Sequence, residues 1–462
     1  MSTFNYTYNF GYIAEGIKKG KLLAIKYSDD ASIMEHRLKV AVDDHQLLTR
    51  TASGHVSALF ADLVDIAVSV HAADRLSYRY RDRTCRIQVQ LPVRSSQFLD
   101  NLSIREELES ILYWFTEDLW SFEFMPYVKS GRTIDVARRL LLDEKAQPTH
   151  VALWSGGLDA LSGLYNRLIQ EPNTHYTLFG TGSNEMIFSL QRDVAKKINT
   201  IFPHRTKLLQ LPIRLRKEDT QISSSARSRG FIFLLLGAVC ALQEKQHTLY
   251  IHENGIGALN LPLRDSEVGL DHSHSVHPLS LYRMGRWLSS LLEEPFSFEN
   301  PFLFVTKAQI CEELLQKNEE LAFSTVSCDS RHRSDPMQCG YCSSCLLRRQ
   351  AIAVLGKEDQ TRYQITTSSE RQKKSSKKER RIHLVAMLAQ VETLRQLLSE
   401  ENPWESMVKQ YPLLDEIVQK MGGAKVENQA RTSTHFLTLY RNYVSEWDIN
   451  TVRHILKQGL LE

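Results

Sequence analysis

The chain contains 462 residues, of which 42% are hydrophobic and 24% are charged, and its formal net charge is +3. This length predicts two to four domains, and these fractions are typical of a soluble globular protein. No apolar run is long enough to span a membrane and no secretory leader stands at 1–5, so we expect a cytoplasmic protein without a membrane partner. The small net charge does not by itself indicate a nucleic-acid partner, which usually binds a strongly basic face.

Residues 1–147 are predicted to form an α+β accessory domain. Apolar or alternating runs predict strands at 21–27, 37–42 and 85–91. The apolar run 61–70 fits either a helix or a buried strand, and we expect a helix. Ser103, with Glu106 three positions later, predicts a capped amphipathic helix that continues through Phe115.

Residues 148–365 alternate between predicted strands and helices. The strands are expected at 151–154, 176–180, 207–211 and 248–252. This alternation predicts an α/β fold with a central doubly wound parallel sheet. In such sheets ligands bind beyond the carboxyl ends of the strands, where the strand order reverses.

The first of these strands ends in a glycine-rich turn, Ser155-Gly156-Gly157-Leu158-Asp159, which leads into a helix. Two glycines let backbone N–H groups turn toward an anion, and the start of the helix adds its positive dipole end. The Gly-Lys-Ser/Thr ending of the usual P-loop is missing, so we expect a bound pyrophosphate, cleavage between the α and β phosphates, and AMP transfer. The alternative is an ordinary strand-to-helix turn capped by Ser155.

Two further cations are candidates for phosphate binding. Arg229 stands at the start of an apolar helix, where a guanidinium can clamp an anion, although a solvated arginine is the alternative. Lys307 opens another helix and is placed to reach a phosphate, although a surface lysine is the more frequent case.

Polar side chains at the end of the fourth central strand are candidates for reading a substrate. Glu253 and Asn254 follow this strand, and His272, His274 and His277 lie in the next loop. We expect Glu253, Asn254 and His277 to contact substrate. Three histidines also suggest a second metal, but no carboxylate stands at clear ligand spacing, so a substrate-facing or solvent-facing loop is expected.

Four of the seven cysteines fall within eighteen residues and are metal-ligand candidates: Cys328, Cys339, Cys342 and Cys345. Gly340 permits the tight turn that brings neighbouring sulfurs onto one ion. Four soft ligands without an open position predict a structural zinc site, with an iron–sulfur cluster as the alternative. The isolated cysteines are expected to be small buried hydrophobes: Cys85, Cys240 and Cys311.

The C-terminal part is predicted to be a helical extension. A basic Ser/Lys-rich linker is expected at 366–381. Amphipathic stretches in 382–462 predict helices at 382–398, 404–421 and 434–457.

The motifs together resemble the QueC family of 7-cyano-7-deazaguanine synthases over about residues 149–356. The resemblance rests on the Ser-Gly-Gly-x-Asp loop and three further segments: 229–234, 306–310 and 339–348. It implies a PP-loop ATPase that uses ATP with Mg²⁺, activates the carboxylate of 7-carboxy-7-deazaguanine as an acyl-adenylate, and forms an amide and then a nitrile. It also implies that Ser155, Gly156, Gly157 and Asp159 hold the pyrophosphate with help from Arg229, and that the four clustered cysteines bind Zn²⁺.

The chain departs from that family in two ways. Ala160 stands where the family loop has a serine, and long segments precede and follow the central part. The layout, including 72–76 and 90–93, looks more like the QueC-like proteins of bacterial antiphage defence operons, such as QatC and the type IV CBASS members. That resemblance implies a changed acceptor, the amino terminus of a partner protein encoded nearby.

Three other functions stay open at this stage. The flanking segments are compatible with a free nitrile or amide synthase that they only stabilise. The basic linker would suit a PP-loop tRNA-modifying enzyme, with 371–381 as the RNA contact. Ala160 would suit a nucleotide-binding scaffold that has lost catalysis.

Overall fold

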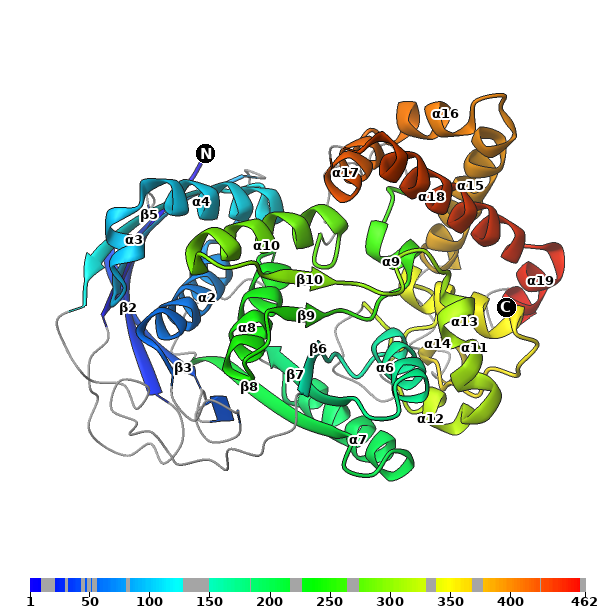
Figure 1. Cartoon of the computed structure of the whole chain (residues 1–462), viewed down its shortest axis with the longest axis horizontal. Coiled ribbons are helices and arrows are strands. Elements are labelled where there is room, and N and C mark those ends of the chain that lie inside the picture. Colours follow the sequence, from blue (N-terminus) through cyan, green and yellow to red (C-terminus); the bar gives the residue numbers. More distant parts are fainter. Residues whose placement is uncertain are drawn as a thin grey trace.

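The computed structural model describes residues 1–9, 21–29, 32–42, 46–47, 51, 56–79, 84–127, 149–182, 184–216, 227–263, 274–329, 338–367, 377–423 and 425–457. These residues form a ten-stranded sheet with the order β10-β9-β6-β7-β8-β3-β2-β1-β4-β5. Helices cover the sheet, and a group of helices formed by the C-terminal residues lies at the opposite end of the molecule from the N-terminal strands (Figure 1).

Five neighbouring strands of the sheet are parallel and confirm the predicted α/β architecture. They are β6 (Thr149–Leu153), β7 (His175–Gly182), β8 (Thr206–Arg216), β9 (Thr248–Tyr250) and β10 (Ser297–Glu299). The chain runs outward from β6 to β8 and then returns to β9 on the other side of β6. The strand order therefore reverses between β6 and β9, and this is the position at which such sheets bind ligands.

The helices between these strands follow the predicted alternation. They are α6 (Leu158–Gln170), α7 (Glu185–Ile201), α8 (Arg229–Gln243), α9 (Gly255–Leu259) and α10 (Pro278–Leu292). After β10 come α11 (Lys307–Lys317), α12 (Glu319–Phe323), α13 (Ser343–Val354) and α14 (Gln364–Thr367). The fourth predicted strand is shorter than expected, because β9 ends at Tyr250 and leaves His252 outside the sheet.

The N-terminal residues extend the same sheet. Their strands are β1 (Thr3–Asn9), β2 (Lys21–Asp29), β3 (Ser32–Val42), β4 (Arg86–Val93) and β5 (Leu119–Pro126). Strand β3 pairs antiparallel with β8, with Val40 opposite Leu215, and so joins the two parts. The division of the chain at residue 147 into two domains stays a prediction.

The described N-terminal residues also form the helices α2 (Ala58–Leu76), α3 (Ser96–Asp100) and α4 (Leu102–Thr116). Helix α2 confirms the helical interpretation of 61–70. The predicted cap of α4 at Ser103 is wrong, because Asn101 accepts a hydrogen bond from the Ile104 N–H at 3.3 Å and places Ser103 inside the first turn.

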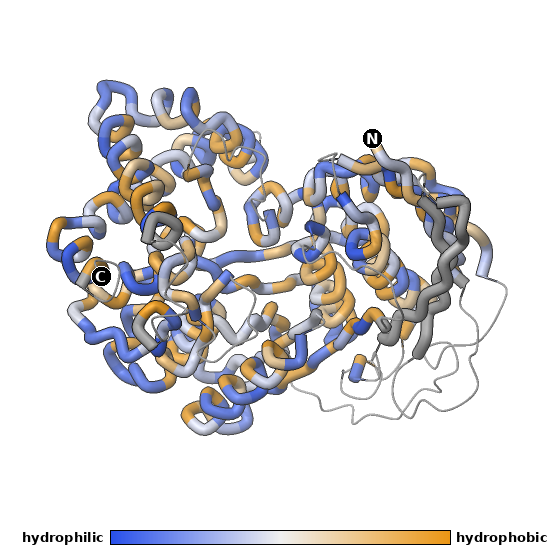
Figure 2. The backbone as a smooth tube through the Cα atoms, turned by 180° about the vertical axis from the view of Figure 1, so that it is seen from behind, coloured by the Kyte–Doolittle hydropathy of each residue, from blue (hydrophilic) through white to orange (hydrophobic). Residues whose placement is uncertain are grey.

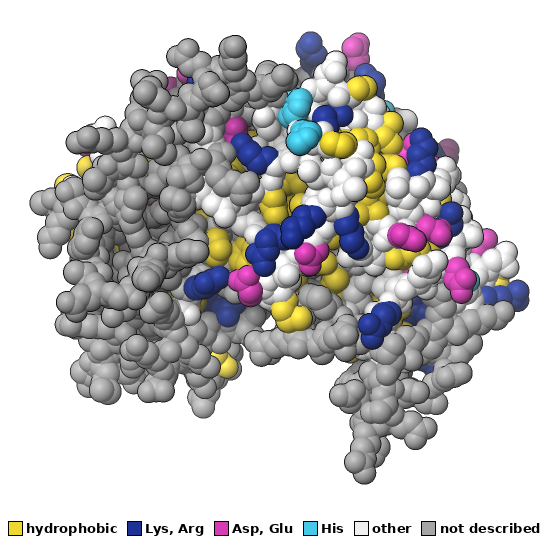
Figure 3. Space-filling view, turned by 90° about the horizontal axis from the view of Figure 1, so that it is seen from below, with side chains coloured by type: hydrophobic (Ala, Val, Ile, Leu, Met, Phe, Trp, Pro, Cys, Tyr) yellow, Lys and Arg dark blue, Asp and Glu magenta, His cyan; other side chains and the backbone are white. Residues whose placement is uncertain are grey.

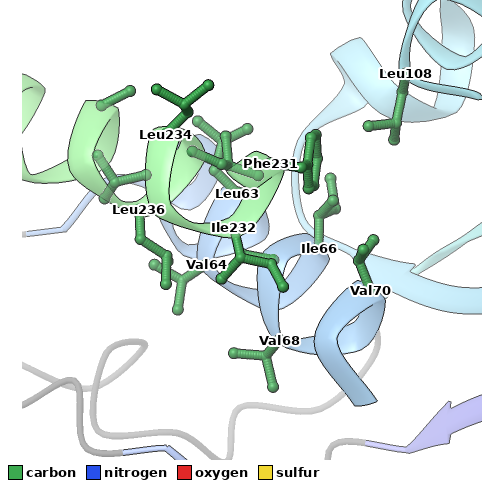
Figure 4. Close-up of a cluster of buried hydrophobic side chains, with 14 of the residues drawn as sticks. Leu63, Val64, Ile66, Val68, Val70, Leu108, Phe231, Ile232, Leu234 and Leu236 are labelled. Carbon is green, nitrogen blue, oxygen red and sulfur yellow. The ribbon is translucent and has the colours of Figure 1, made fainter. Parts of the chain in front are cut away.

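The largest hydrophobic core crosses from the N-terminal to the central part. Apolar side chains of α2, among them Leu63 and Val64, pack against Phe231 and Ile232 of α8, and Leu108 of α4 belongs to the same cluster (Figure 4). Helix α8 in turn contacts β6, β7 and β9. Hydrophobic stretches of the chain gather where helices and strands pack together (Figure 2).

The C-terminal residues are helical, as predicted. The helices are α15 (Lys377–Ser399), α16 (Pro403–Gln410), α17 (Leu413–Gly422), α18 (Val426–Glu446) and α19 (Ile449–Lys457). Of the predicted linker at 366–381, residues 368–376 lie outside the described residues, and the linker prediction is wrong for the rest, because 366–367 end α14 and 377–381 begin α15. Among the helices that the structure describes, none is both long and apolar enough to cross a bilayer.

Candidate active site and metal site

The turn after β6 has the backbone of an anion-binding loop. Gly156 adopts φ +74°, and a Cβ there would lie 3.2 Å from Cα of Gln191. Gly157 is the N-cap residue of α6 and offers no side-chain cap, while the exposed Ser155 accepts a hydrogen bond from the Gly157 N–H at 3.1 Å. Ser155 therefore stabilises the loop without occupying the cap position, and α6 begins just after the carboxyl end of β6, beside the reversal of the strand order.

Gln191 of α7 holds this loop through Trp154, and no local pattern in the sequence indicates this role. The Gln191 side chain donates to the carbonyl of Trp154 at 2.9 Å, and the Trp154 indole donates to the Gln191 carbonyl at 3.1 Å. Gln210 of β8 donates to the Gln191 side-chain oxygen at 2.8 Å. Helix α7 directly, and β8 through Gln210, therefore fix the residue before Ser155.

Below the loop, Asp159 of α6, Asn254 after β9 and Lys307 of α11 meet in a buried cluster. The Asn254 amide donates to Oδ1 of Asp159 at 3.0 Å, and the Lys307 ammonium bonds to Oδ2 of the same carboxylate. Lys307 is only 3% exposed and Asn254 is fully buried, so Lys307 is not the surface lysine of the alternative interpretation. We call Asp159, Glu253, Asn254 and Lys307 the Asp159 cluster.

Glu253 is the second carboxyl group of this cluster. The Asn254 amide also donates to Oε1 of Glu253 at 2.8 Å, so one amide joins both acids. Burial raises the pKa of Glu253 to about 8, with a further contribution from the Asp159 charge, while Lys307 opposes the shift. The site therefore has two acidic groups for one buried ammonium.

Arg229, the first residue of α8, has an exposed side chain whose guanidinium lies 5.0 Å from the centre of the Phe233 ring. Desolvation nevertheless lowers its pKa, and the charge of Asp329 opposes that shift. The same Asp329 charge raises the pKa of Glu253. Because the Arg229 side chain is exposed, its guanidinium can pair with a bound anion.

The predicted substrate residue His277 contacts α10 and two aromatic rings. It caps α10 by accepting from the Leu279 N–H at 3.3 Å, and burial lowers its pKa to about 3. Its ring lies 5.7 Å from that of Trp114 and 5.6 Å from that of His274. The described contacts do not join His277 to the Asp159 cluster, so its substrate contact stays a prediction, and His272 lies outside the described residues.

Ala160, where the family loop has a serine, belongs to a buried hydrophobic cluster with Leu161 and Leu164 and is 6% exposed. Its methyl group therefore contributes to the core beneath α6.

The four clustered cysteines converge as a metal site requires. The sulfur atoms of Cys328, Cys339, Cys342 and Cys345 are buried and all lie within 4.8 Å of one another. Cys328 and Cys342 are 3.8 Å apart, and Cys339 and Cys345 are 3.9 Å apart. Four thiolates bonded to zinc at about 2.3 Å in a tetrahedron have sulfurs about 3.8 Å apart, so the donor set fits Zn²⁺.

The backbone around these sulfurs also suits thiolates. The N–H groups of Tyr341 and Cys342 donate to the Cys339 sulfur at 3.5 and 3.3 Å, and Gly340, between Cys339 and Tyr341, has φ +86°. Arg349 donates to the Gly340 carbonyl at 2.8 Å and to the Ile455 carbonyl of α19 at 3.0 Å. The cysteine turn is therefore tied directly to the C-terminal helices.

Residues 277–356 match the family described as queuosine biosynthesis protein QueC. The chain has no match among curated proteins. The matched range contains Lys307 and all four clustered cysteines, whereas the Ser155 loop and Arg229 lie before it. The match supports a QueC-like family, and the fold places the unmatched Asp159 against the matched Lys307.

Proposed function

We propose that the chain is an ATP-dependent ligase that adenylates the carboxylate of a 7-deazaguanine and then forms an amide. The observation that carries this proposal is the Asp159–Lys307–Asn254 cluster, buried beneath a glycine-rich loop at the reversal of the strand order. The QueC match supports the 7-deazaguanine part. The missing Gly-Lys-Ser/Thr ending supports attack at the α phosphate.

In this proposal the substrate carboxylate attacks the α phosphorus, and pyrophosphate leaves. The backbone N–H groups of 155–158 hold the pyrophosphate, which replaces the Ser155 hydroxyl as the acceptor for the Gly157 N–H. Arg229 pairs with a phosphate oxygen, and Lys307 supplies positive charge at the base of the loop. Asp159 keeps Lys307 charged and oriented, because the two form a buried pair. Mg²⁺, when bound with ATP, would neutralise further phosphate charge.

In the second step an amine nitrogen attacks the acyl carbon, AMP leaves, and the nitrogen loses a proton. Glu253, beyond the end of β9, would contact the base or the amine, and the buried Asn254 would orient it through the hydrogen bond between the two side chains. The zinc site has a structural role in this scheme, because all four ligands are cysteines and no position is open.

We propose that the amine is the N-terminus of a partner protein in antiphage defence. The large N-terminal and C-terminal parts support this, because they lie on opposite sides of the central strands and add surface for a protein acceptor. Ammonia as the acceptor would give a free amide or nitrile instead. A tRNA acceptor has less support, because Lys and Arg side chains stand among acidic and hydrophobic ones on the described part of the face in Figure 3.

The direct test is incubation with ATP, Mg²⁺ and 7-carboxy-7-deazaguanine, followed by nucleotide analysis and pyrophosphate exchange. We expect AMP and pyrophosphate, and we expect Ser155→Ala and Asp159→Ala to abolish AMP release with unchanged zinc content. ADP as the sole nucleotide product would exclude adenylation, and no turnover would favour a scaffold.

Intact mass spectrometry of the protein encoded beside this chain then tests the acceptor. An added deazaguanine acyl mass supports conjugation. An unchanged mass together with a small-molecule nitrile would assign nitrile synthesis, and tight, salt-sensitive tRNA binding would favour RNA modification.

A further inference from the structure

A buried ionic cluster in the N-terminal part contacts Ser228, the residue that precedes Arg229. Arg79 donates to Oδ1 of Asp74 at 2.9 Å and to both oxygens of Asp118. Both aspartates are fully buried, and Asp118 also accepts from the Cys85 N–H at 2.8 Å. We call Asp74, Arg79 and Asp118 the Asp74 cluster; it joins the end of α2 to the starts of β4 and β5.

The second carboxylate oxygen of Asp74 binds Ser228, the residue before Arg229. Oδ2 of Asp74 accepts from the Ser228 backbone N–H at 2.9 Å and from the Ser228 hydroxyl at 2.7 Å. Ser228 is the N-cap residue of α8 and its own side chain caps no amide of that helix. The Asp74 carboxylate, from the N-terminal part of the chain, therefore lies at the start of α8, where the helix dipole favours negative charge.

Two more contacts fix the same turn from the N-terminal part. Arg227 donates to the Thr116 carbonyl at 3.0 Å. Gly230 packs so closely that a Cβ there would lie 2.9 Å from the Phe115 ring and 2.5 Å from Cα of Ser275. The residues on both sides of Arg229 are thus held, while the Arg229 guanidinium makes no hydrogen bond or ion pair with the described residues.

We propose that the Asp74 cluster positions Arg229 for the phosphates of the bound nucleotide, so that the N-terminal part of the chain completes the ATP site. This inference rests on the proposed function. Since Asp74 occupies the start of α8, the helix end is closed to a second anion. The positive group that this turn presents is the Arg229 side chain, and its direction depends on the backbone at Ser228.

The decisive variant is Ser228→Ala, which removes the hydroxyl bond to Asp74 and keeps the backbone bond, so the fold is retained. Loss of one hydrogen bond to a charged group predicts about a tenfold fall in kcat/KM for ATP in pyrophosphate exchange, mainly through KM. In an Arg229→Ala background the same change should cost less than about twofold, because the group being positioned is gone. Asp74→Asn should act in the same direction.

The matched control is a second cluster on the same helix. Arg94 donates to Asp62 at 2.8 Å and to Asp65 at 2.7 Å, also in the interior, but this cluster has no contact with Ser228 among the described residues. Asp65→Asn should leave kcat/KM for ATP unchanged.

The positioning role would be overturned if Ser228→Ala lowered kcat/KM for ATP equally with and without Arg229, or if Asp65→Asn lowered it as much as Ser228→Ala does. Pyrophosphate exchange by the wild-type chain would still uphold the proposed function in that case. A wild-type chain without exchange would overturn both.

Discussion

Replacing Lys307 with methionine would remove the ammonium that pairs with Asp159 and leave the length of the side chain nearly unchanged. The Lys307 side chain is 4% exposed and the Asp159 side chain is 12% exposed, so water cannot take the place of the lost charge. Asp159 would keep the Asn254 amide as its hydrogen-bond donor in the cluster.

The expected cost follows from this burial. Breaking a buried ion pair on one side destabilises a protein by about 3–5 kcal/mol, because the remaining charge is uncompensated. The double variant Asp159→Asn/Lys307→Met removes both charges and should recover most of that loss, because the desolvation cost disappears with the charges.

Urea unfolding of both variants and of Asp159→Asn measures the coupling, and pyrophosphate exchange measures activity. We expect the double variant to be folded but inactive, because Lys307 also supplies charge to the phosphates. A Lys307→Met variant as stable as the wild type would refute the argument for a buried pair. Exchange at the wild-type rate in the double variant would refute the role in ATP binding.

Three further predictions concern separate parts of the site. The pKa of Glu253 is raised from 4.5 to about 8 in the fold, so the stability that its carboxyl group contributes is complete below pH 4.5 and is lost as the pH rises through 8. The melting temperature of Glu253→Gln, compared with that of the wild type, should therefore be higher at pH 8.5 than at pH 5. An equal difference between variant and wild type at both pH values would contradict the shift. Cys339→Ser should lower the bound zinc, measured by elemental analysis, and the stability, whereas Cys240→Ala should retain the metal; equal zinc in both would exclude the cluster as its site. Gly156→Ala should weaken ATP binding at least tenfold by calorimetry, because alanine at φ +74° is strained and its methyl meets Gln191; unchanged affinity would show that the loop does not hold the nucleotide.

The parallel strands could be predicted because strands buried on both faces are short apolar runs between helical patterns. Strand β1 was missed although Phe4, Tyr6 and Tyr8 alternate with polar residues and are buried. Strand β10 has three residues and no period to detect. The cap of α4 was misplaced because Asn101 and Ser103 both suit a cap, and only the structure shows which one accepts the bond.

The site was predicted one group at a time. Ser155 to Asp159, Asn254 and Lys307 were each identified from the residues around them, but the bond between Lys307 and Asp159 joins positions 148 apart in the sequence. Asp74 lies in the segment 72–76 used for the resemblance, but neither its contact with Ser228 nor the role of Gln191 had a local signal, because both depend on which loops the fold brings together. Contacts between residues far apart in the sequence depend on the order of the strands in the sheet, and a single sequence does not show that order.

The pairing of β3 with β8 has a consequence for any attempt to reduce this protein to a minimal catalytic unit. A fragment that begins near residue 148 would leave β8 with an open hydrogen-bonding edge and would strip α2 from the apolar surface of α8. Unpaired edges and bare apolar faces promote self-association, so such a fragment should aggregate.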